Sequence, residues 1–344
     1  MRKNLFAAAM ALWLAFGARA EKQTLNLFIW SEYIDPAVVA DFEKQFACKV
    51  NIDLYEDVES MLAKVQGGGG SLYDVVVPTD HIVAAMIKLN LLAPLRHENI
   101  PNLKNLDAKF TSLPYDRGNK FTVAYQWGTL GVFARQTKDK PLPQSWEILF
   151  DPQQQPGAFL LMDSPRDLMG AALKYRGHSV NSTDPKQLKE ARDLIISAKK
   201  RSLGFDGSVG AKNKVLAKSA KAAIVYSGEG VKGMAEDKET VYFIPKEGGI
   251  IWVDNLAVLA KAPHRELAEK FINFVLDPKI GARLSNFIQY SSPNKAALQF
   301  IRPEDLKNPA IYPTPEILAR LEFLEDLGAK MRLYDEVWTQ VKAK

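Results

Sequence analysis

Apolar runs that end abruptly in polar and aromatic residues recur along this chain. The first run, residues 25–29, has the continuous apolar character of a strand that is buried on both faces. A group of polar and aromatic side chains follows it directly: Trp30, Ser31, Glu32 and Tyr33. Asp35 then offers a helix N-cap, with Pro36 at the first helical position. We therefore predict a strand, a loop with chemistry-bearing side chains, and a helix.

The same pattern continues through the first hundred residues. Residues 38–46 have helical spacing, and residues 50–55 alternate as a strand does. Residues 75–77 form another apolar run, and Thr79 and His81 lie just beyond its end. This alternation of strands and helices predicts an α/β domain with a parallel sheet. Ligands of such sheets bind at the carboxyl ends of the strands, where these polar residues fall.

Further strands are predicted at residues 121–125, 130–134, 159–162 and 222–226. After Arg135 the composition becomes polar and proline-rich, which indicates a crossover into a second domain. The chain returns to the first domain along residues 250–256. There Trp252 and Asp254 lie at i and i+2, on one side of an extended segment.

The first twenty residues have the pattern of a secretory signal peptide. Arg2 and Lys3 precede an apolar stretch, and residues 18–20 form an A-x-A cleavage signal. Removal of residues 1–20 takes away three basic residues and no acid, so the formal charge falls from +5 to +2. We find no basic block of the kind that binds nucleic acid. Cys48 is the single cysteine, so we expect no internal disulfide.

Acidic and aromatic residues gather at the predicted strand ends. The acids are Glu32, Asp163, Asp167, Glu229 and Asp254, and the aromatics are Trp30, Tyr33, Trp127, Tyr226, Trp252 and Tyr290. A cleft with this lining suits an elongated organic cation, because aromatic faces flank methylenes and carboxylates accept ammonium hydrogens. Scattered surface acids and core aromatics are the alternative. An enzyme could instead use Asp163/Asp167 or Glu32/Asp254 as the acid–base pair of a glycoside hydrolase.

Several segments together resemble the periplasmic polyamine-binding proteins of bacterial ABC importers. They are residues 28–33, 73–79, 125–128, 245–254 and 290–297, in order along the chain. The resemblance implies a two-lobed α/β fold of the type II periplasmic-binding class, in which each lobe is a mainly parallel sheet flanked by helices. We expect lobe 1 to comprise residues 21–134 plus 254–300, and lobe 2 residues 135–253 plus 301–344.

The resemblance also implies a function and a set of ligand-binding residues. The expected set is Trp30, Ser31, Glu32, Tyr33, Thr79, His81, Trp127, Asp167, Ser208, Tyr226, Glu229, Trp252, Asp254 and Tyr290. Ser164, Tyr226 and Leu324 depart from the spermidine pattern, and Glu32 and Glu229 stand where putrescine binders carry Asp. We therefore favour a putrescine-like ligand, although His81 is atypical and its protonation would oppose a bound cation.

The expected protein is a monomeric periplasmic receptor that delivers a polyamine to an ABC transporter permease. It has no catalytic role, no cofactor, no metal and no nucleic-acid partner. Two alternatives remain at this point. One is a receptor for another small cation, such as agmatine or a basic amino acid, for which Arg166 would have to hold the carboxylate. The other is a secreted glycoside hydrolase with paired carboxylates.

Overall fold

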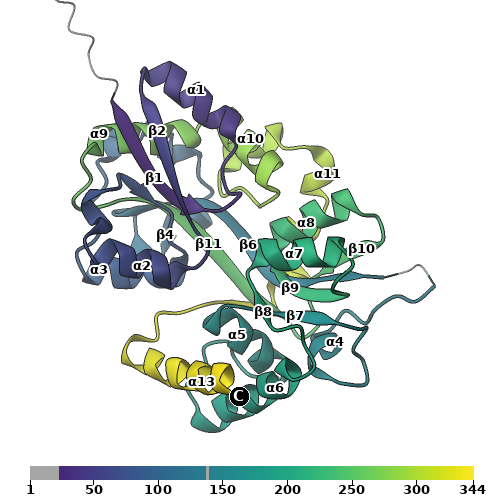
Figure 1. The fold of residues 1–344 in the computed structure, drawn as a ribbon. Helices are drawn as coiled ribbons and strands as arrows, with labels where there is room; N and C mark the ends of the chain where they lie inside the picture. The colour runs from purple at the N-terminus through teal and green to yellow at the C-terminus, as the bar shows by residue number, and fades with distance from the viewer. Residues whose placement is uncertain (1–22, 137–138) are drawn as a thin grey trace, which may run out of the picture.

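The computed structural model describes residues 23–136 and 139–344 (Figure 1). The predicted signal peptide, residues 1–20, lies outside the described residues. The elements form an α/β fold with a curved mixed sheet and helices on both sides of it, which confirms the predicted class. No helix of the described residues is long and apolar enough to cross a bilayer.

One half of the molecule is built around the strands that begin the chain. Their order is β2 (Lys49–Tyr55), β1 (Thr24–Trp30), β3 (Val75–Val76), β11 (Gly249–Val258) and β6 (Thr122–Arg135). β1 is parallel to β2 and β3, whereas β11 is antiparallel to β3 and β6. The helices around this half are α1 (Pro36–Phe46), α2 (Val58–Gln66), α3 (Asp80–Lys88), α9 (Arg265–Val275) and α10 (Pro278–Ile288).

The other half continues the sheet from β6 through β9 (Ala222–Tyr226), β7 (Phe159–Met162) and β8 (Phe205–Asp206). β10 (Thr240–Phe243) pairs with β6, and β12 (Leu321–Phe323) pairs with β11. The helices here are α4 (Glu147–Phe150), α5 (Pro165–Tyr175), α6 (Pro185–Lys199), α7 (Ser208–Leu216), α8 (Ser227–Glu236), α12 (Pro315–Leu318) and α13 (Met331–Ala343). α11 (Pro303–Leu306) lies beside α10 of the first half, where the backbone N–H of Arg302 donates to Asn286 Oδ1 at 3.2 Å. α13 packs against α5 and α6 (Figure 1).

Short elements complete the structure. A two-stranded hairpin joins β4 (Ser112–Leu113) to β5 (Asp116–Arg117). The 3₁₀ segments are Gly69–Ser71, His97–Asn99, Pro101–Asn105, Ala108–Phe110, Lys295–Phe300 and Gly328–Lys330. The four-glycine run at residues 67–70 ends α2 and enters the first of these segments. The glycine run is therefore the end of a helix, and it does not form a phosphate-binding loop.

Asp-Pro pairs begin three helices, α1, α6 and α10. In each, the Asp carboxylate accepts a hydrogen bond from the backbone N–H two residues further on, at 2.7–2.9 Å. The proline occupies the first helical position, where no N–H donor is needed. A cap of this kind contributes about 1 kcal/mol. The cap at Asp35 fixes where α1 begins, and so fixes the loop between Trp30 and α1.

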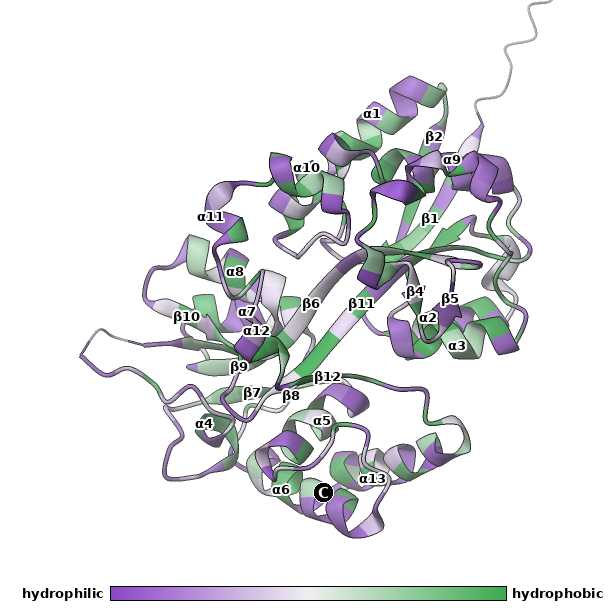
Figure 2. Ribbon diagram, turned by 180° about the vertical axis from the view of Figure 1, so that it is seen from behind, coloured by the Kyte–Doolittle hydropathy of each residue, from purple (hydrophilic) through white to green (hydrophobic). Residues whose placement is uncertain are grey.

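The long strand β6 joins the two halves of the sheet. Residues 122–129 pair with β11, and residues 130–134 pair with β9. The sequence predicted two strands here, but the structure has one continuous strand that is buried along its whole length. Figure 2 shows that β1 and β11 are largely hydrophobic, as expected for strands covered on both faces. The predicted lobe boundaries remain a prediction.

One region differs from the expected secondary structure. The sequence predicted helical stretches between residues 315 and 328, but α12 ends at Leu318 and β12 follows it. β12 lies parallel to the start of β11, with Leu321 opposite Gly249. Tertiary pairing with an existing strand therefore overrides the local helical preference here.

Candidate functional site

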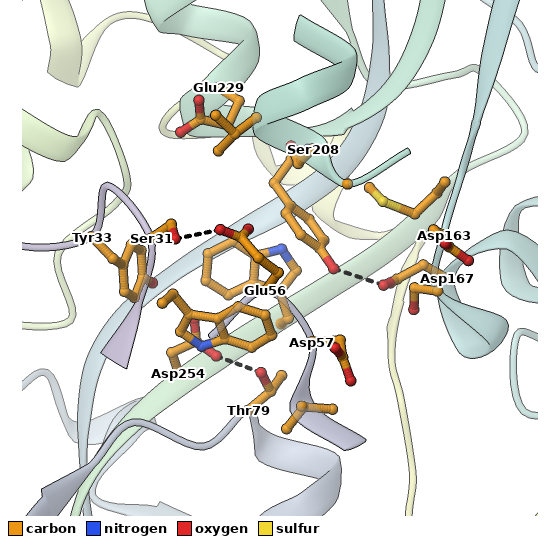
Figure 3. Close-up of a pocket in the computed structure, with 18 of the residues that line it drawn as sticks. Ser31, Tyr33, Glu56, Asp57, Thr79, Asp163, Asp167, Ser208, Glu229 and Asp254 are labelled. Atoms are coloured by element: carbon orange, nitrogen blue, oxygen red, sulfur yellow. Dashed lines mark hydrogen bonds between the residues drawn. The ribbon is translucent and has the colours of Figure 1, made fainter. Parts of the chain in front are cut away.

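A cleft of about 970 Å³, including space open to solvent, lies between the two halves. Residues from both halves line it, and they sit mainly on loops that follow strands (Figure 3). The loop after β1, the loop after β3, the start of α5, the start of α7 and the end of β9 all contribute. The location follows the rule that ligands of α/β sheets bind at strand ends.

Aromatic rings form the walls of the cleft. Trp252 contacts Tyr290 and Tyr226 edge-on, with ring centroids 5.1 and 5.7 Å apart. Tyr33 contacts Tyr290 at 5.5 Å. A hydrogen bond fixes the indole of Trp30, whose Nε1 donates to the carbonyl of Val77 at 3.1 Å. These contacts hold the rings rigidly, so the walls are formed before any ligand arrives.

Asp254 is a deeply buried acid of the cleft. It is 5% exposed, and its Oδ1 accepts a 2.6 Å hydrogen bond from Thr79 Oγ1. The register of β11 shifts between Asp254 and Asn255, and such bulges often redirect side chains at functional sites. Burial raises the pKa of Asp254 to about 7, although hydrogen bonds from Thr79 and Tyr33 oppose the shift. A buried acid of this kind favours a cation beside it.

Asp167 is a second buried acid, in the first turn of α5. Its Oδ2 accepts a 2.8 Å hydrogen bond from the Tyr226 hydroxyl (Figure 3). Burial raises its pKa, and the hydrogen bond from Tyr226 opposes the shift. No ion pair among the described residues involves Asp167 or Asp254, so neither carboxylate has a partner cation from this chain.

Glu229 and Glu32 have a different environment. Both pair with lysines of the chain itself, Lys212 and Lys232, at 2.9–3.6 Å. Glu229 lines the cleft at the end away from Asp254 and Asp167 (Figure 3). Glu32 is half-exposed, has a backbone φ of 53°, and does not line the cleft.

Most of the predicted site residues meet at this cleft. Those that line it are Trp30, Ser31, Tyr33, Thr79, His81, Asp167, Ser208, Tyr226, Glu229, Trp252, Asp254 and Tyr290. Glu32 and Trp127 do not. His81 faces the cleft with a mostly buried ring, and its Nδ1 lies 3.5 Å from Asp80 Oδ1. The predicted juxtaposition of strand-end residues is therefore present, and their role in ligand binding remains a proposal.

The pleat of the sheet explains why Trp127 is not in the cleft. Trp127 lies opposite Val253 in the β6–β11 pair, and opposite residues point to the same face. Val253 alternates with Trp252 and Asp254, which face the cleft, so Trp127 points to the other side. There it packs against Phe110, with ring centroids 6.1 Å apart. The prediction that Trp127 lines the binding site is not supported by this placement.

The structure adds lining residues that the sequence reasoning did not single out. They are Glu56, Asp57, Val58, Glu59, Met162, Gly207 and Val209. Asp163, Ser164 and Leu324, which the sequence analysis named without including them in the expected binding set, also line the cleft. The acids of residues 56–59 follow β2 directly, and β2 is parallel to β1. Ser31 donates a hydrogen bond to Glu56 across this gap (Figure 3). The strand-end rule that found Trp30 and Ser31 could also have found these acids.

Arg166 points away from the cleft. Its guanidinium donates to the carbonyl of Glu325 at 3.1 Å and to Asn181 Oδ1 at 2.8 Å. The charged group also lies 4.8 Å from the centre of the Tyr334 ring. Arg166 therefore anchors the C-terminal segment, and it does not line the cleft.

Comparisons with known proteins add two kinds of finding. Residues 37–314 match the model of a family described as bacterial extracellular solute-binding protein. A putrescine/cadaverine-binding protein of Pseudomonas aeruginosa is 34% identical over 357 residues, with all of both chains covered. A spermidine/putrescine-binding periplasmic protein of Escherichia coli is 30% identical, over 99% of this chain and 98% of the relative.

A solved structure has the same fold. It is the spermidine/putrescine ABC transporter substrate-binding protein of Streptococcus pneumoniae, with a TM-score of 0.80 and 28% identity. The alignment covers 94% of this chain and 99% of that one.

Proposed function

Because the chain belongs to the bacterial extracellular solute-binding protein family, we propose that it captures a small polyamine in its cleft and delivers it to an ABC transporter permease. The family and the periplasmic relatives confirm the predicted location in the periplasm. The relatives are binding proteins, and we propose that this chain likewise performs no chemistry on its ligand.

The observation that carries the proposal is a pair of buried acids without a cation. Asp254 and Asp167 face an aromatic-walled cleft, and the described residues provide no ammonium or guanidinium partner for either of them. An uncompensated buried carboxylate is unfavourable, so the site is poised for a cation from outside. A charge-assisted hydrogen bond to such a ligand contributes about 1.5–3 kcal/mol, and a cation–aromatic contact about 0.5–2 kcal/mol.

The alternatives have less support. A basic amino acid needs a cation for its carboxylate, and the obvious candidate, Arg166, is committed to Asn181 and Glu325. Agmatine lacks the carboxylate and remains compatible with the cleft. Two carboxylate pairs were considered for a glycoside hydrolase, and one of them, Glu32/Asp254, has little support because Glu32 is outside the cleft and paired with lysines. Asp163, the other candidate, is paired with Lys342 at 2.5 Å.

We further propose that the protein works as a monomer whose lobes close on the ligand by a hinge. The continuity of β6 and β11 between the two halves supports a hinge in these strands. The proposed lobes are residues 21–134 plus 254–300, and residues 135–253 plus 301–344. The packing of α13 on α5 and α6 supports assigning the C-terminal segment to the second lobe.

Isothermal titration tests the proposed function. The protein is unfolded and refolded to remove carried-over ligand, and then titrated with putrescine, cadaverine, spermidine, spermine, agmatine and arginine. We expect micromolar or tighter binding of at least one amine, which corresponds to about −8 kcal/mol or better. Absence of binding to every amine would refute the polyamine assignment and leave only the family and the fold.

A further inference from the structure

A cluster of four charged residues closes the Glu229 end of the cleft. Glu32 comes from the loop after β1, Lys212 from α7, and Glu229 and Lys232 from α8. Lys212 Nζ lies 3.0 Å from Glu229 Oε2 and 3.6 Å from Glu32 Oε2. Lys232 Nζ lies 2.9 Å from Glu229 Oε1 and 3.5 Å from Glu32 Oε2. Each lysine therefore contacts both carboxylates.

Both carboxylate oxygens of Glu229 form ion pairs in this cluster: Oε1 also accepts a hydrogen bond from Lys232 at 2.9 Å, whereas Oε2 has no hydrogen-bond partner among the described residues. Each of its two oxygens faces a different ammonium group of the chain. Glu229 and Lys212 are both 4% exposed, so water screens their interaction little. Burial alone would lower the pKa of Lys212, but Glu229 and Glu32 outweigh burial and the pKa is raised. Lys212 is therefore a cation at neutral pH.

The charges of the cluster balance, with two lysines facing two glutamates. A ligand ammonium that reached Glu229 would meet a carboxylate that is already neutralised, with two like charges beside it. The charges in the region of Asp254 and Asp167 are not balanced in this way, because both acids there lack a partner cation within the described part of the chain. The cleft is thus electrostatically unequal along its length (Figure 3).

We propose that Lys212, supported by Lys232, is a specificity-determining residue that fills the ammonium subsite at Glu229 with a cation of the protein. The inference rests on the proposed function. The ligand class that fits is a short diamine whose ammonium groups are held in the Asp254 and Asp167 region. An ammonium group of a triamine or tetraamine that reaches the Glu229 end gains nothing there, because Lys212 and Lys232 already pair with that carboxylate.

The test is the ratio of two dissociation constants, for spermidine and for putrescine, measured by titration calorimetry. We expect the unmodified protein to bind putrescine at least about tenfold more tightly than spermidine. Lys212→Met leaves Lys232 as the one cation of the cluster facing both carboxylates, which gives the cluster a net negative charge. We expect it to lower the spermidine/putrescine ratio of dissociation constants by about tenfold or more. Lys212→Arg keeps the cation and should leave the ratio unchanged.

Lys214→Met is the matched control. Lys214 is on the same helix, is half-exposed, and pairs with Asp206 at 2.7 Å. Its loss changes the net charge equally, so an equal change in the ratio would show a general effect of charge and overturn the inference. An unchanged ratio in folded Lys212→Met would overturn it as well. If circular dichroism shows that Lys212→Met is not folded, Lys232→Gln replaces it with the same expectation.

Failure of this inference can be distinguished from failure of the proposed function. Binding of putrescine with no discrimination against spermidine in the unmodified protein would overturn the specificity role and leave the polyamine receptor standing. No binding of any amine by the unmodified protein would refute the receptor itself, and the inference with it.

Discussion

Amine binding by this protein should depend strongly on pH, through Asp254. The carboxylate is buried beside Thr79 and Tyr33, and its pKa is raised to about 7 in the ligand-free protein. A bound ammonium favours the charged form, so a protonated Asp254 must lose its proton when a cation binds. The polyamine itself remains protonated throughout this range. Acidification should therefore weaken binding because it protonates Asp254, and not because it changes the charge of the ligand.

The size of the effect follows from linkage. Below a pKa of about 7, each further pH unit leaves about tenfold less of the binding-competent carboxylate. Between pH 8 and pH 5 the affinity for putrescine should fall by about a hundredfold. Asp254→Asn should remove this dependence and weaken binding at pH 8 by about 10- to 150-fold, the value of one charge-assisted hydrogen bond.

The same shift predicts an opposite effect on stability. The pKa of Asp254 in the folded protein, about 7, lies above the ordinary value of 3.8 for an aspartate. The folded protein therefore binds a proton at Asp254 more tightly than the unfolded chain does. Asp254 therefore lowers the free energy of unfolding as pH rises from about 4 to 7, by at most about 4 kcal/mol. Asp254→Asn should accordingly raise the melting temperature of the ligand-free protein at pH 8, while it lowers affinity.

Titration calorimetry at several pH values, in buffers with different ionisation enthalpies, measures both affinity and proton release. The groups that face Asp254 are Thr79, Tyr33, Asp80 and His81. His81→Gln is the control variant, because His81 also lines the cleft and faces Asp254. If His81→Gln loses the pH dependence and Asp254→Asn retains it, the assignment to Asp254 is refuted. A change of less than twofold between pH 8 and pH 5 would refute the reasoning altogether.

Three further predictions follow from the placement of side chains. Trp252→Ala should weaken putrescine binding by about 2- to 30-fold without unfolding the protein, because the ring lines the cleft in which the ligand is proposed to bind. Titration calorimetry measures the affinity, and circular dichroism checks that the variant is folded. Trp127→Phe should lower the melting temperature and leave the dissociation constant within about twofold, because Trp127 packs against Phe110 away from the cleft. Agmatine should bind at least about a hundredfold more tightly than arginine, because Arg166 cannot reach the additional carboxylate; equal binding of the two would contradict the placement of Arg166.

Much of this site could be predicted from one rule, that polar residues following buried strands meet at one edge of a sheet. Asp254, inside the antiparallel strand β11, was identified from its alternation with Trp252, but the rule itself brought together Trp30 and Thr79 at the ends of the parallel strands β1 and β3. It required no contact information, because parallel strands place their carboxyl ends side by side. The acids of residues 56–59 obey the same rule after β2, although the sequence analysis did not apply the rule to that strand end.

The rule fails where the direction of a side chain matters more than its position along a strand. Trp127 lies inside a continuous strand, so the alternation of side chains along that strand decides to which face of the sheet it points. That face can be assigned only when the partner strand and its register are known. The sequence divided β6 into two strands, so it gave no register across this region. Trp127 was then counted among the cleft aromatics although Val253, its cross-strand neighbour, belongs to the opposite face.

The acids of the cleft show a second limit of prediction from the sequence, which concerns how their charge is paired and not where they lie. Asp254 and Glu229 look equivalent in the sequence, because each is an acid close to the end of a buried strand. In the structure Asp254 has no partner cation among the described residues, whereas Glu229 is held between Lys212 and Lys232. Lys212 comes from a different helix than Glu229, and no local pattern links the two residues. A carboxylate binds a ligand amine only if the protein has not already supplied a cation to it, and that condition is decided by tertiary packing.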